Sequence, residues 1–368
     1  MNCDLISLAT PGISRIHPYQ PGKPVEELER ELGITGIIKL ASNENALGPS
    51  PHIMEALATL PELYRYPDGN GFALKQALSR IHRVQPEQIT LGNGSNDILD
   101  LIARAFVTDK DQVIFSQHAF AIYKLVTLSV GAEGIEIPAL DYGHDLAAML
   151  AAVTGKTRLV YIANPNNPTG TWLHGTDLKQ FMEELPENIM VLVDQAYYEY
   201  AVGPDYVDSI EWLNEFPNLV VTRTFSKAHG LAGLRVGYGI SHPQAADLMN
   251  RVRQPFNVNS VALMAAEIAL EERDHIARSV VFNSAGMEQL ATGFKDMGIR
   301  FIPSRGNFIC FDLGRPARGV YEGLLQEGVI VRPIESYGLP NHLRVTVGTA
   351  EENDRFLTAL ARVTAKNF

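Results

Sequence analysis

Short apolar runs rich in β-branched residues recur along the first two thirds of the chain, separated by stretches with helical periodicity and by loops. Runs that are apolar on both faces are typical of a mostly parallel sheet, because helices cover both faces of such a sheet. The pattern predicts an α/β fold with strands at residues 89–95, 111–116, 132–137, 157–163, 189–194, 219–224 and 235–240. The connection before the last strand is too short for a crossover helix, so we expect that strand to be antiparallel.

The pattern changes in the last third of the chain. A long helical region over 260–297 is followed by strands at 299–303 and 307–312, a helix near 316–327, strands at 329–333 and 342–347, and a helix from 351. The proline-rich stretch up to residue 36 is expected to be extended, with a short helix over 25–32. Because 368 residues exceed the usual size of one core, we predict an N-terminal arm (1–36), a large domain (37–275) and a small domain (276–368).

Composition excludes several classes of function. The formal net charge of −11 argues against nonspecific binding of nucleic acid and against anionic membrane surfaces. Only Cys3 and Cys310 are present, so no disulfide framework is expected, and the scattered histidines predict no metal site. The chain starts without a basic and then apolar signal, and no apolar run is long enough to span a membrane. We therefore expect a cytoplasmic protein without nucleic-acid or membrane partners.

The run Thr-Phe-Ser-Lys-Ala-His-Gly-Leu-Ala-Gly-Leu-Arg at 224–235 places Lys227 in a loop directly after a predicted strand. A lysine amine is mostly protonated at neutral pH, so covalent chemistry needs a site that lowers its pKa or converts it to an imine. Thr224, Ser226 and Arg235 are placed to bind an anionic group close by. Taken alone, the run is compatible with an ordinary surface lysine.

Three further segments put polar side chains at the ends of predicted strands and favour the chemical interpretation. The loop Asn-Pro-Asn-Asn-Pro-Thr-Gly at 164–170 delivers Asn167 to the edge where open α/β sheets bind ligands. The strand Val-Leu-Val ends in Asp194, and Tyr197 follows three residues later. The turn Leu-Gly-Asn-Gly-Ser-Asn-Asp at 91–97 precedes a helical pattern, and backbone N–H groups at such a helix N-terminus bind phosphate.

In this order and spacing, the four segments resemble the fold-type I aminotransferases that use pyridoxal 5′-phosphate, over residues 40 to 348. Finer detail resembles the histidinol-phosphate aminotransferase branch, in the runs Leu-Ala-Ser-Asn-Glu-Asn-Ala-Leu-Gly-Pro-Ser-Pro (40–51), Arg-Tyr-Pro-Asp (65–68), Gly-Leu-Ala-Gly-Leu-Arg-Val-Gly-Tyr (230–238) and Leu-Arg-Val-Thr-Val-Gly-Thr (343–349). The resemblance implies a large domain with a mostly parallel seven-stranded sheet covered by helices. It also implies a smaller α+β C-terminal domain joined by the N-terminal arm, and a homodimer with shared active sites.

The resemblance also implies site residues. Lys227 would bind the cofactor covalently and serve as general base, Asp194 would keep its ring nitrogen protonated, and Asn167 and Tyr197 would donate to its phenolic oxygen. The cofactor phosphate would be held by Gly94, Ser95, Asn96, Thr224, Ser226 and Arg235, with Phe120 stacked on the ring and Tyr66 reaching the neighbouring subunit's cofactor. Arg344 would bind the substrate carboxylate as a fork, and the substrate site would also include Arg332, Asn43 and Tyr19. His118 and His229 lie near the site without an assigned role.

The implied reaction moves an amino group between histidinol phosphate and 2-oxoglutarate, giving imidazole-acetol phosphate and glutamate, in histidine biosynthesis. The alternative is an aromatic amino acid aminotransferase for phenylalanine or tyrosine, because this branch includes enzymes that accept aromatic rings in place of the imidazole. Cations for a substrate phosphate would discriminate the two, and Arg332, Arg344 and Tyr19 are the candidates. A cofactor-sensing transcription regulator is disfavoured, since the residues ahead of the core lack a basic DNA-reading domain.

Overall fold

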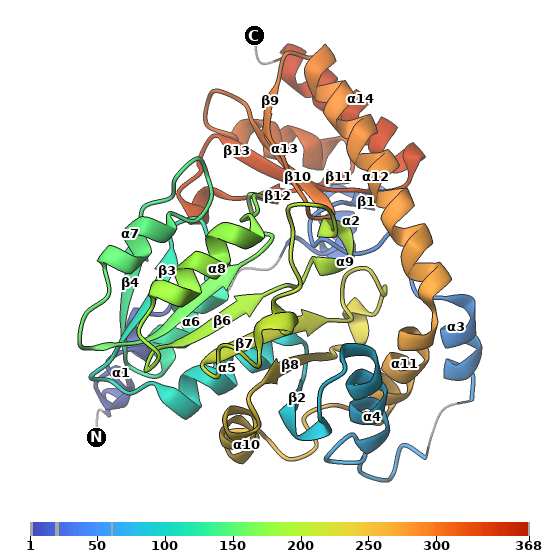
Figure 1. The fold of residues 1–368 in the computed structure, drawn as a ribbon. Helices are drawn as coiled ribbons and strands as arrows, with labels where there is room; N and C mark the ends of the chain where they lie inside the picture. Colours follow the sequence, from blue (N-terminus) through green and yellow to red (C-terminus); the bar gives the residue numbers. More distant parts are fainter. Residues whose placement is uncertain (1–2, 19–21, 60–61, 367–368) are drawn as a thin grey trace.

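The computed structural model describes residues 3–18, 22–59 and 62–366. Its largest sheet has seven strands, in the order β2-β8-β7-β6-β5-β3-β4 (Figure 1). The strands are β2 (Ile89–Gly92), β3 (Gln112–Ser116), β4 (Glu133–Ile137), β5 (Thr157–Ala163), β6 (Met190–Asp194), β7 (Leu219–Thr224) and β8 (Gly237–Ser241). Of these, β8 alone runs antiparallel to its neighbours β2 and β7. The predicted fold is confirmed, including the antiparallel last strand.

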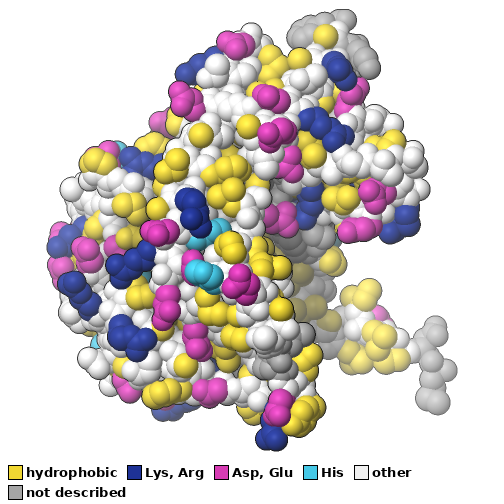
Figure 2. Space-filling model, turned by 90° about the vertical axis from the view of Figure 1, so that its right-hand side faces the viewer, with side chains coloured by type: hydrophobic (Ala, Val, Ile, Leu, Met, Phe, Trp, Pro, Cys, Tyr) yellow, Lys and Arg dark blue, Asp and Glu magenta, His cyan; other side chains and the backbone are white. Residues whose placement is uncertain are grey.

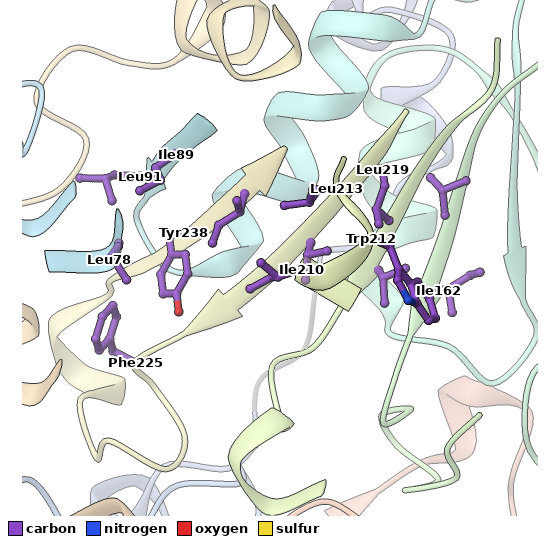
Figure 3. Close-up of a cluster of buried hydrophobic side chains, with 14 of the residues drawn as sticks. Leu78, Ile89, Leu91, Ile162, Ile210, Trp212, Leu213, Leu219, Phe225 and Tyr238 are labelled. Atoms are coloured by element: carbon purple, nitrogen blue, oxygen red, sulfur yellow. The ribbon is translucent and has the colours of Figure 1, made fainter. Parts of the chain in front are cut away.

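Helices cover both faces of this sheet. One face carries α5 (Ser95–Phe106), α6 (Ala121–Ser129) and α10 (Pro243–Val252). The other carries α3 (Pro51–Leu57), α4 (Phe72–His82), α7 (Leu146–Ala151), α8 (Gly175–Glu184) and α11 (Ser260–Glu271). Along β6, Val191 and Val193 point into the core beneath α8, whereas Leu192 points into the core beneath α5. Because side chains alternate along a strand, both faces must be apolar, as the sequence pattern indicates. Figure 3 shows part of the core on the face that carries α4, α8 and α11.

The C-terminal part forms a second, antiparallel sheet in the order β12-β13-β10-β9. Its strands are β9 (Arg300–Ile302), β10 (Phe308–Asp312), β12 (Arg332–Pro333) and β13 (His342–Thr346), covered by α12 (Arg273–Asp296), α13 (Arg318–Gln326) and α14 (Ala350–Lys366). Phe294 stacks on Phe311 at 4.7 Å between ring centroids inside this core. The helical region expected over 260–297 is two helices, since Glu272 between them has the non-helical ψ of 55°. The domain boundary at 275 and 276 stays a prediction, and α12 runs through it.

The N-terminal arm contacts both parts of the molecule (Figure 1). Its first elements, α1 (Leu5–Leu8) and η1 (Ile13–Arg15), lie near α6, where a Cβ on Gly12 would come within 1.8 Å of the Leu128 carbonyl oxygen. Its helix α2 (Val25–Leu32), at the predicted position, buries Leu28 against Ile330 of the C-terminal part. There β1 (Ile38–Lys39) pairs in parallel with β11 (Val329–Ile330). The arm therefore ties the start of the chain to both sheets.

Short elements complete the chain. They are the helix α9 (Tyr198–Ala201) and the 3-10 turns η2 (Pro86–Gln88), η3 (Ser209–Trp212), η4 (Ala232–Leu234) and η5 (Glu335–Tyr337). Within the described ranges, no helix has both the length and the apolar character that crossing a membrane requires.

Candidate active site

A cavity of about 240 Å³ lies at the carboxyl ends of β5, β6 and β7 and is closed on one side by the C-terminal sheet. Parallel strands deliver their last residues to one edge, where α/β proteins bind ligands. The residues predicted from the sequence that line this cavity are Asn43, Ser95, Asn96, Phe120, Asn167, Asp194, Tyr197, Thr224, Ser226, Lys227, Arg235, Arg332 and Arg344. Segments up to three hundred residues apart in sequence thus meet in one site.

Lys227 follows β7 and projects its amine into the cavity, where Nζ donates a hydrogen bond to the carbonyl oxygen of Ser42 at 3.1 Å. Burial and, to a smaller extent, the positive charges of Arg344 and Arg235 together lower the pKa of Lys227 to about 7, against the opposing carboxylates of Glu44 and Asp194. A substantial fraction of the amine is therefore unprotonated at neutral pH. An unprotonated amine is a nucleophile and a base, which the surface lysine of the alternative interpretation would not be.

Asp194 ends β6 and is buried, with a residue exposure of 7%. Its Oδ1 accepts from the Thr222 hydroxyl at 3.0 Å and from the Ala196 N–H at 3.2 Å, and its Oδ2 accepts from the Tyr123 hydroxyl at 3.1 Å. Burial raises the pKa of Asp194, although these hydrogen bonds and the charge of Lys227 favour the ionised form. A cation placed beside this carboxylate would stabilise that form further.

Tyr123 is a site residue that the sequence analysis missed. It belongs to α6 and is fully buried, so its position in an apolar helix is typical of a core residue. Ser42 was missed as well, because it contributes through its backbone carbonyl, which no side-chain motif reveals.

Tyr197 and Arg344 are connected through Asn167. The Tyr197 hydroxyl oxygen accepts from the side-chain amides of Asn43 at 2.8 Å and Asn167 at 3.2 Å. Arg344 donates from Nη1 to Asn167 Oδ1 at 2.5 Å and from Nη2 to the Ala41 carbonyl oxygen at 2.8 Å. Burial raises the pKa of Tyr197 to about 12, so its hydroxyl is a proton donor at neutral pH. Arg332 lies beside Arg344, because the two residues are cross-strand partners in β12 and β13.

An anion-binding arrangement occupies another wall of the cavity. The helix α5 begins at Ser95, after Gly94 in a positive-φ conformation of 80°. The Arg235 guanidinium packs so closely that a Cβ on Gly94 would lie 2.3 Å from its Nη2 atom. Arg235 also donates to the Ser226 hydroxyl at 3.2 Å. A guanidinium, hydroxyl groups and the N–H groups of a helix N-terminus together suit a phosphate.

One predicted site residue, Tyr66, and the two histidines without an assigned role, His118 and His229, are not among the residues that line the cavity. Tyr66 does not line its own chain's cavity; it is 82% exposed and stacks on Phe256 at 4.7 Å. Tyr19 lies outside the described residues. His118 contacts the Tyr337 carbonyl oxygen through Nδ1 at 2.6 Å, and His229 lies 3.7 Å from Glu199. No group of three or more potential metal ligands was found within the described ranges.

Comparison with known proteins gives one consistent result. The family model for class I and II aminotransferases matches residues 35–360. The chain is 56% identical to histidinol-phosphate aminotransferase 2 of Pseudomonas fluorescens over 100% of both chains, and 56% identical to the Pseudomonas aeruginosa protein of that name, over 98% of this chain and 99% of the other. A solved structure of the Sinorhizobium meliloti histidinol-phosphate aminotransferase with pyridoxal 5′-phosphate matches with a TM-score of 0.91 and 30% identity, over 98% of this chain and 99% of the other.

The chain therefore belongs to the class I and II aminotransferase family. The fold-type I architecture and the likeness to the histidinol-phosphate aminotransferase branch, both predicted from the sequence motifs, are confirmed.

Proposed function

We propose that this protein is a histidinol-phosphate aminotransferase that uses pyridoxal 5′-phosphate and moves an amino group between histidinol phosphate and 2-oxoglutarate. The observation that carries the proposal is one cavity that combines the Lys227 amine of lowered pKa, the buried Asp194 carboxylate and the anion-binding arrangement at Arg235. The similarity to histidinol-phosphate aminotransferases over the full length of the chain supports the substrate.

The donors and acceptors in the cavity fit pyridoxal phosphate. Its phosphate would be held by Gly94, Ser95, Asn96, Thr224, Ser226 and Arg235. The close approach of Arg235 to Gly94 leaves no room for a side chain there, so the backbone is exposed to the anion. Lys227 would take the aldehyde, Asp194 the ring nitrogen, and Phe120 one face of the ring. When bound, the cofactor supplies an electron sink for negative charge at the substrate α-carbon.

The protein's own groups would then move and hold protons. Asp194, surrounded by three hydrogen-bond donors, would keep a proton on the ring nitrogen by remaining ionised. The Lys227 amine would take the proton from the substrate α-carbon and return it to the cofactor's former aldehyde carbon, which a pKa near 7 favours at neutral pH. Arg344 would exchange its present contact with Asn167 for the α-carboxylate of glutamate or 2-oxoglutarate, or for the phosphate that histidinol phosphate carries instead.

A second cation favours histidinol phosphate over an aromatic amino acid. Histidinol phosphate carries a phosphate where an amino acid has its α-carboxylate, and a phosphate can bear two negative charges. Arg332 and Arg344 are paired across adjacent strands and both line the cavity, so two guanidinium groups lie close enough together to bind one such dianion. Phenylalanine carries only a singly charged carboxylate. We expect Arg332→Gln to lose most turnover with histidinol phosphate and little with phenylalanine, and Arg332→Lys to keep part of the former. Side-by-side turnover of histidinol phosphate, phenylalanine and tyrosine, each with 2-oxoglutarate, tests this. Faster wild-type turnover of phenylalanine would refute the assignment.

We further propose a cytoplasmic homodimer in which Tyr66 contributes to the partner's site. Tyr66 is exposed and does not line its own chain's cavity, and Leu63, Tyr64 and Phe72, close to it in sequence, are exposed as well. Figure 2 looks onto the side that carries α3 and shows apolar side chains exposed on the lower part of that face. Such a surface is typical of an interface.

Mixing two inactive variants tests the shared site. Tyr66→Ala and Lys227→Ala, exchanged into heterodimers, would give one site with both residues intact and one with neither. Statistical mixing should then restore up to about a quarter of wild-type activity per site. If exchange is verified and activity stays at the sum of the two variants, Tyr66 serves its own chain.

A further inference from the structure

Asn43 lies between the two sheets and is fixed by the C-terminal one. Its backbone has a φ of 55°, and its N–H donates to the Thr346 hydroxyl oxygen at 2.9 Å. The side chain of Asn307 donates to the Asn43 carbonyl oxygen at 3.1 Å. Asn43 and Thr346 are 1% and 3% exposed, so water is not an alternative partner for either residue. The backbone of Asn43 is therefore held in one conformation.

The Thr346 hydroxyl also sets the direction of the Asn43 side-chain amide. Its oxygen already accepts from the backbone N–H, so its proton can be donated to Asn43 Oδ1, at 3.2 Å. With Oδ1 facing Thr346, the amide nitrogen faces Tyr197 and donates to its hydroxyl oxygen at 2.8 Å. One hydroxyl on β13 thus determines whether Tyr197 meets a donor or an acceptor.

A tyrosine hydroxyl has one proton and accepts two hydrogen bonds. The amides of Asn43 and Asn167 both donate to the Tyr197 oxygen, which fills its acceptor positions. The proton of Tyr197 must then point away from both amides, and Tyr197 lines the cavity. We infer that Thr346 and Asn43 are positioning residues, which turn the Tyr197 O–H toward the cavity and the phenolic oxygen of the cofactor. This inference rests on the proposed function.

Removal of the Thr346 hydroxyl should reverse this arrangement. In Thr346→Val, which keeps the shape of the side chain, the Asn43 amide is free to turn and present Oδ1 to Tyr197. Tyr197 would then donate its proton to Asn43 and no longer to the cavity. A phenolic oxygen that loses a donor is a stronger base, so the bound cofactor should hold its proton to higher pH.

The readout is the pH midpoint at which the visible absorption band of the cofactor-loaded protein changes, measured without substrate. We expect Thr346→Val to raise this midpoint by roughly half to one pH unit, which is the shift that the net free energy of one hydrogen bond, about 1 kcal/mol, would cause. Thr346→Ser keeps the hydroxyl and should keep the wild-type midpoint. Thr157→Val is the matched control: Thr157 is 2% exposed and its hydroxyl accepts from the Thr154 N–H at 2.9 Å, in β5 away from Tyr197.

Two more variants separate positioning from general damage. Asn43→Gly removes the amide, tolerates the positive φ and should raise the midpoint even if Thr346→Val does not fold. In a Tyr197→Phe background, Thr346→Val should cause no further shift, because the group it positions is absent. A wild-type midpoint in both Thr346→Val and Asn43→Gly, or an equal shift in Thr346→Ser, overturns the inference. Absence of any visible band in the wild-type protein would instead contradict the proposed cofactor.

Discussion

Replacing Lys227 by methionine in the cofactor-free protein measures how strongly the cavity opposes a charged amine. Burial lowers the pKa of Lys227 from 10.5 to about 7. At about 1.36 kcal/mol per pKa unit, this difference of roughly 3.5 units corresponds to about 5 kcal/mol of destabilisation when the amine is charged. Because the side chain keeps some exposure to the cavity, we expect about 2–4 kcal/mol. Lys227→Met should therefore be more stable than the wild type at neutral pH.

The sign of the pH dependence follows from proton binding. Between pH 10.5 and about 7, the unfolded chain binds a proton on Lys227 that the folded chain does not bind, so stability falls as pH falls through this window. Above pH 10.5 the amine is neutral in both the folded and the unfolded chain, so it no longer destabilises the folded protein. Below about 7 it is charged in both states and the cost is constant. The stability gain of Lys227→Met should accordingly shrink as pH rises from 7 to 10.

Urea unfolding of both proteins at pH 7, 8.5 and 10, with the cofactor removed, supplies the free energies of unfolding. Lys124→Met, at a lysine whose side chain is 61% exposed, controls for loss of a lysine from the chain as a whole. The reasoning is wrong if Lys227→Met increases the free energy of unfolding by the same amount at pH 7 and pH 10, or if the variant is less stable than the wild type at pH 7. In either case desolvation of the amine is not the dominant effect.

Two further predictions concern the anion-binding wall and a buried ion pair. Gly94→Ala should weaken pyridoxal phosphate binding at least tenfold and lower the thermal midpoint of unfolding, because the new Cβ would clash with Arg235 and the backbone has a φ of 80°. Fluorescence titration measures the affinity, and thermal melting measures the midpoint. Unchanged affinity would contradict the phosphate assignment. Asp208→Ala should cost about 3–5 kcal/mol in urea unfolding, because Arg223, with a 3% exposed side chain, loses its partner at 2.7 Å. A loss below about 1 kcal/mol would show that the remaining contacts of Arg223, with Gln195 and the Tyr198 ring, compensate for the lost carboxylate.

The sequence by itself determined the strands, their order of appearance and the motif loops that follow them. A strand that is buried on both faces needs apolar residues at consecutive positions. Such a run can be recognised in the sequence alone, as in the residues before Asp194. The loop containing Lys227 and the glycine turn before α5 are equally local, because strand ends, turns and helix starts depend on neighbouring residues. The helix over 25–32 and the antiparallel last strand were predicted for the same reason.

Only the tertiary structure decided which side chains meet. Tyr123 lies 71 positions from Asp194, and its contact depends on how α6 packs over the sheet. Asn43 and Thr346 are 303 positions apart, and no local pattern indicates that they bond. The lowered pKa of Lys227 is likewise a sum of burial and distant charges, among them Arg344 from the C-terminal sheet. Desolvation and Coulomb interaction depend on distance in space, which a chain acquires only when its separate elements pack together.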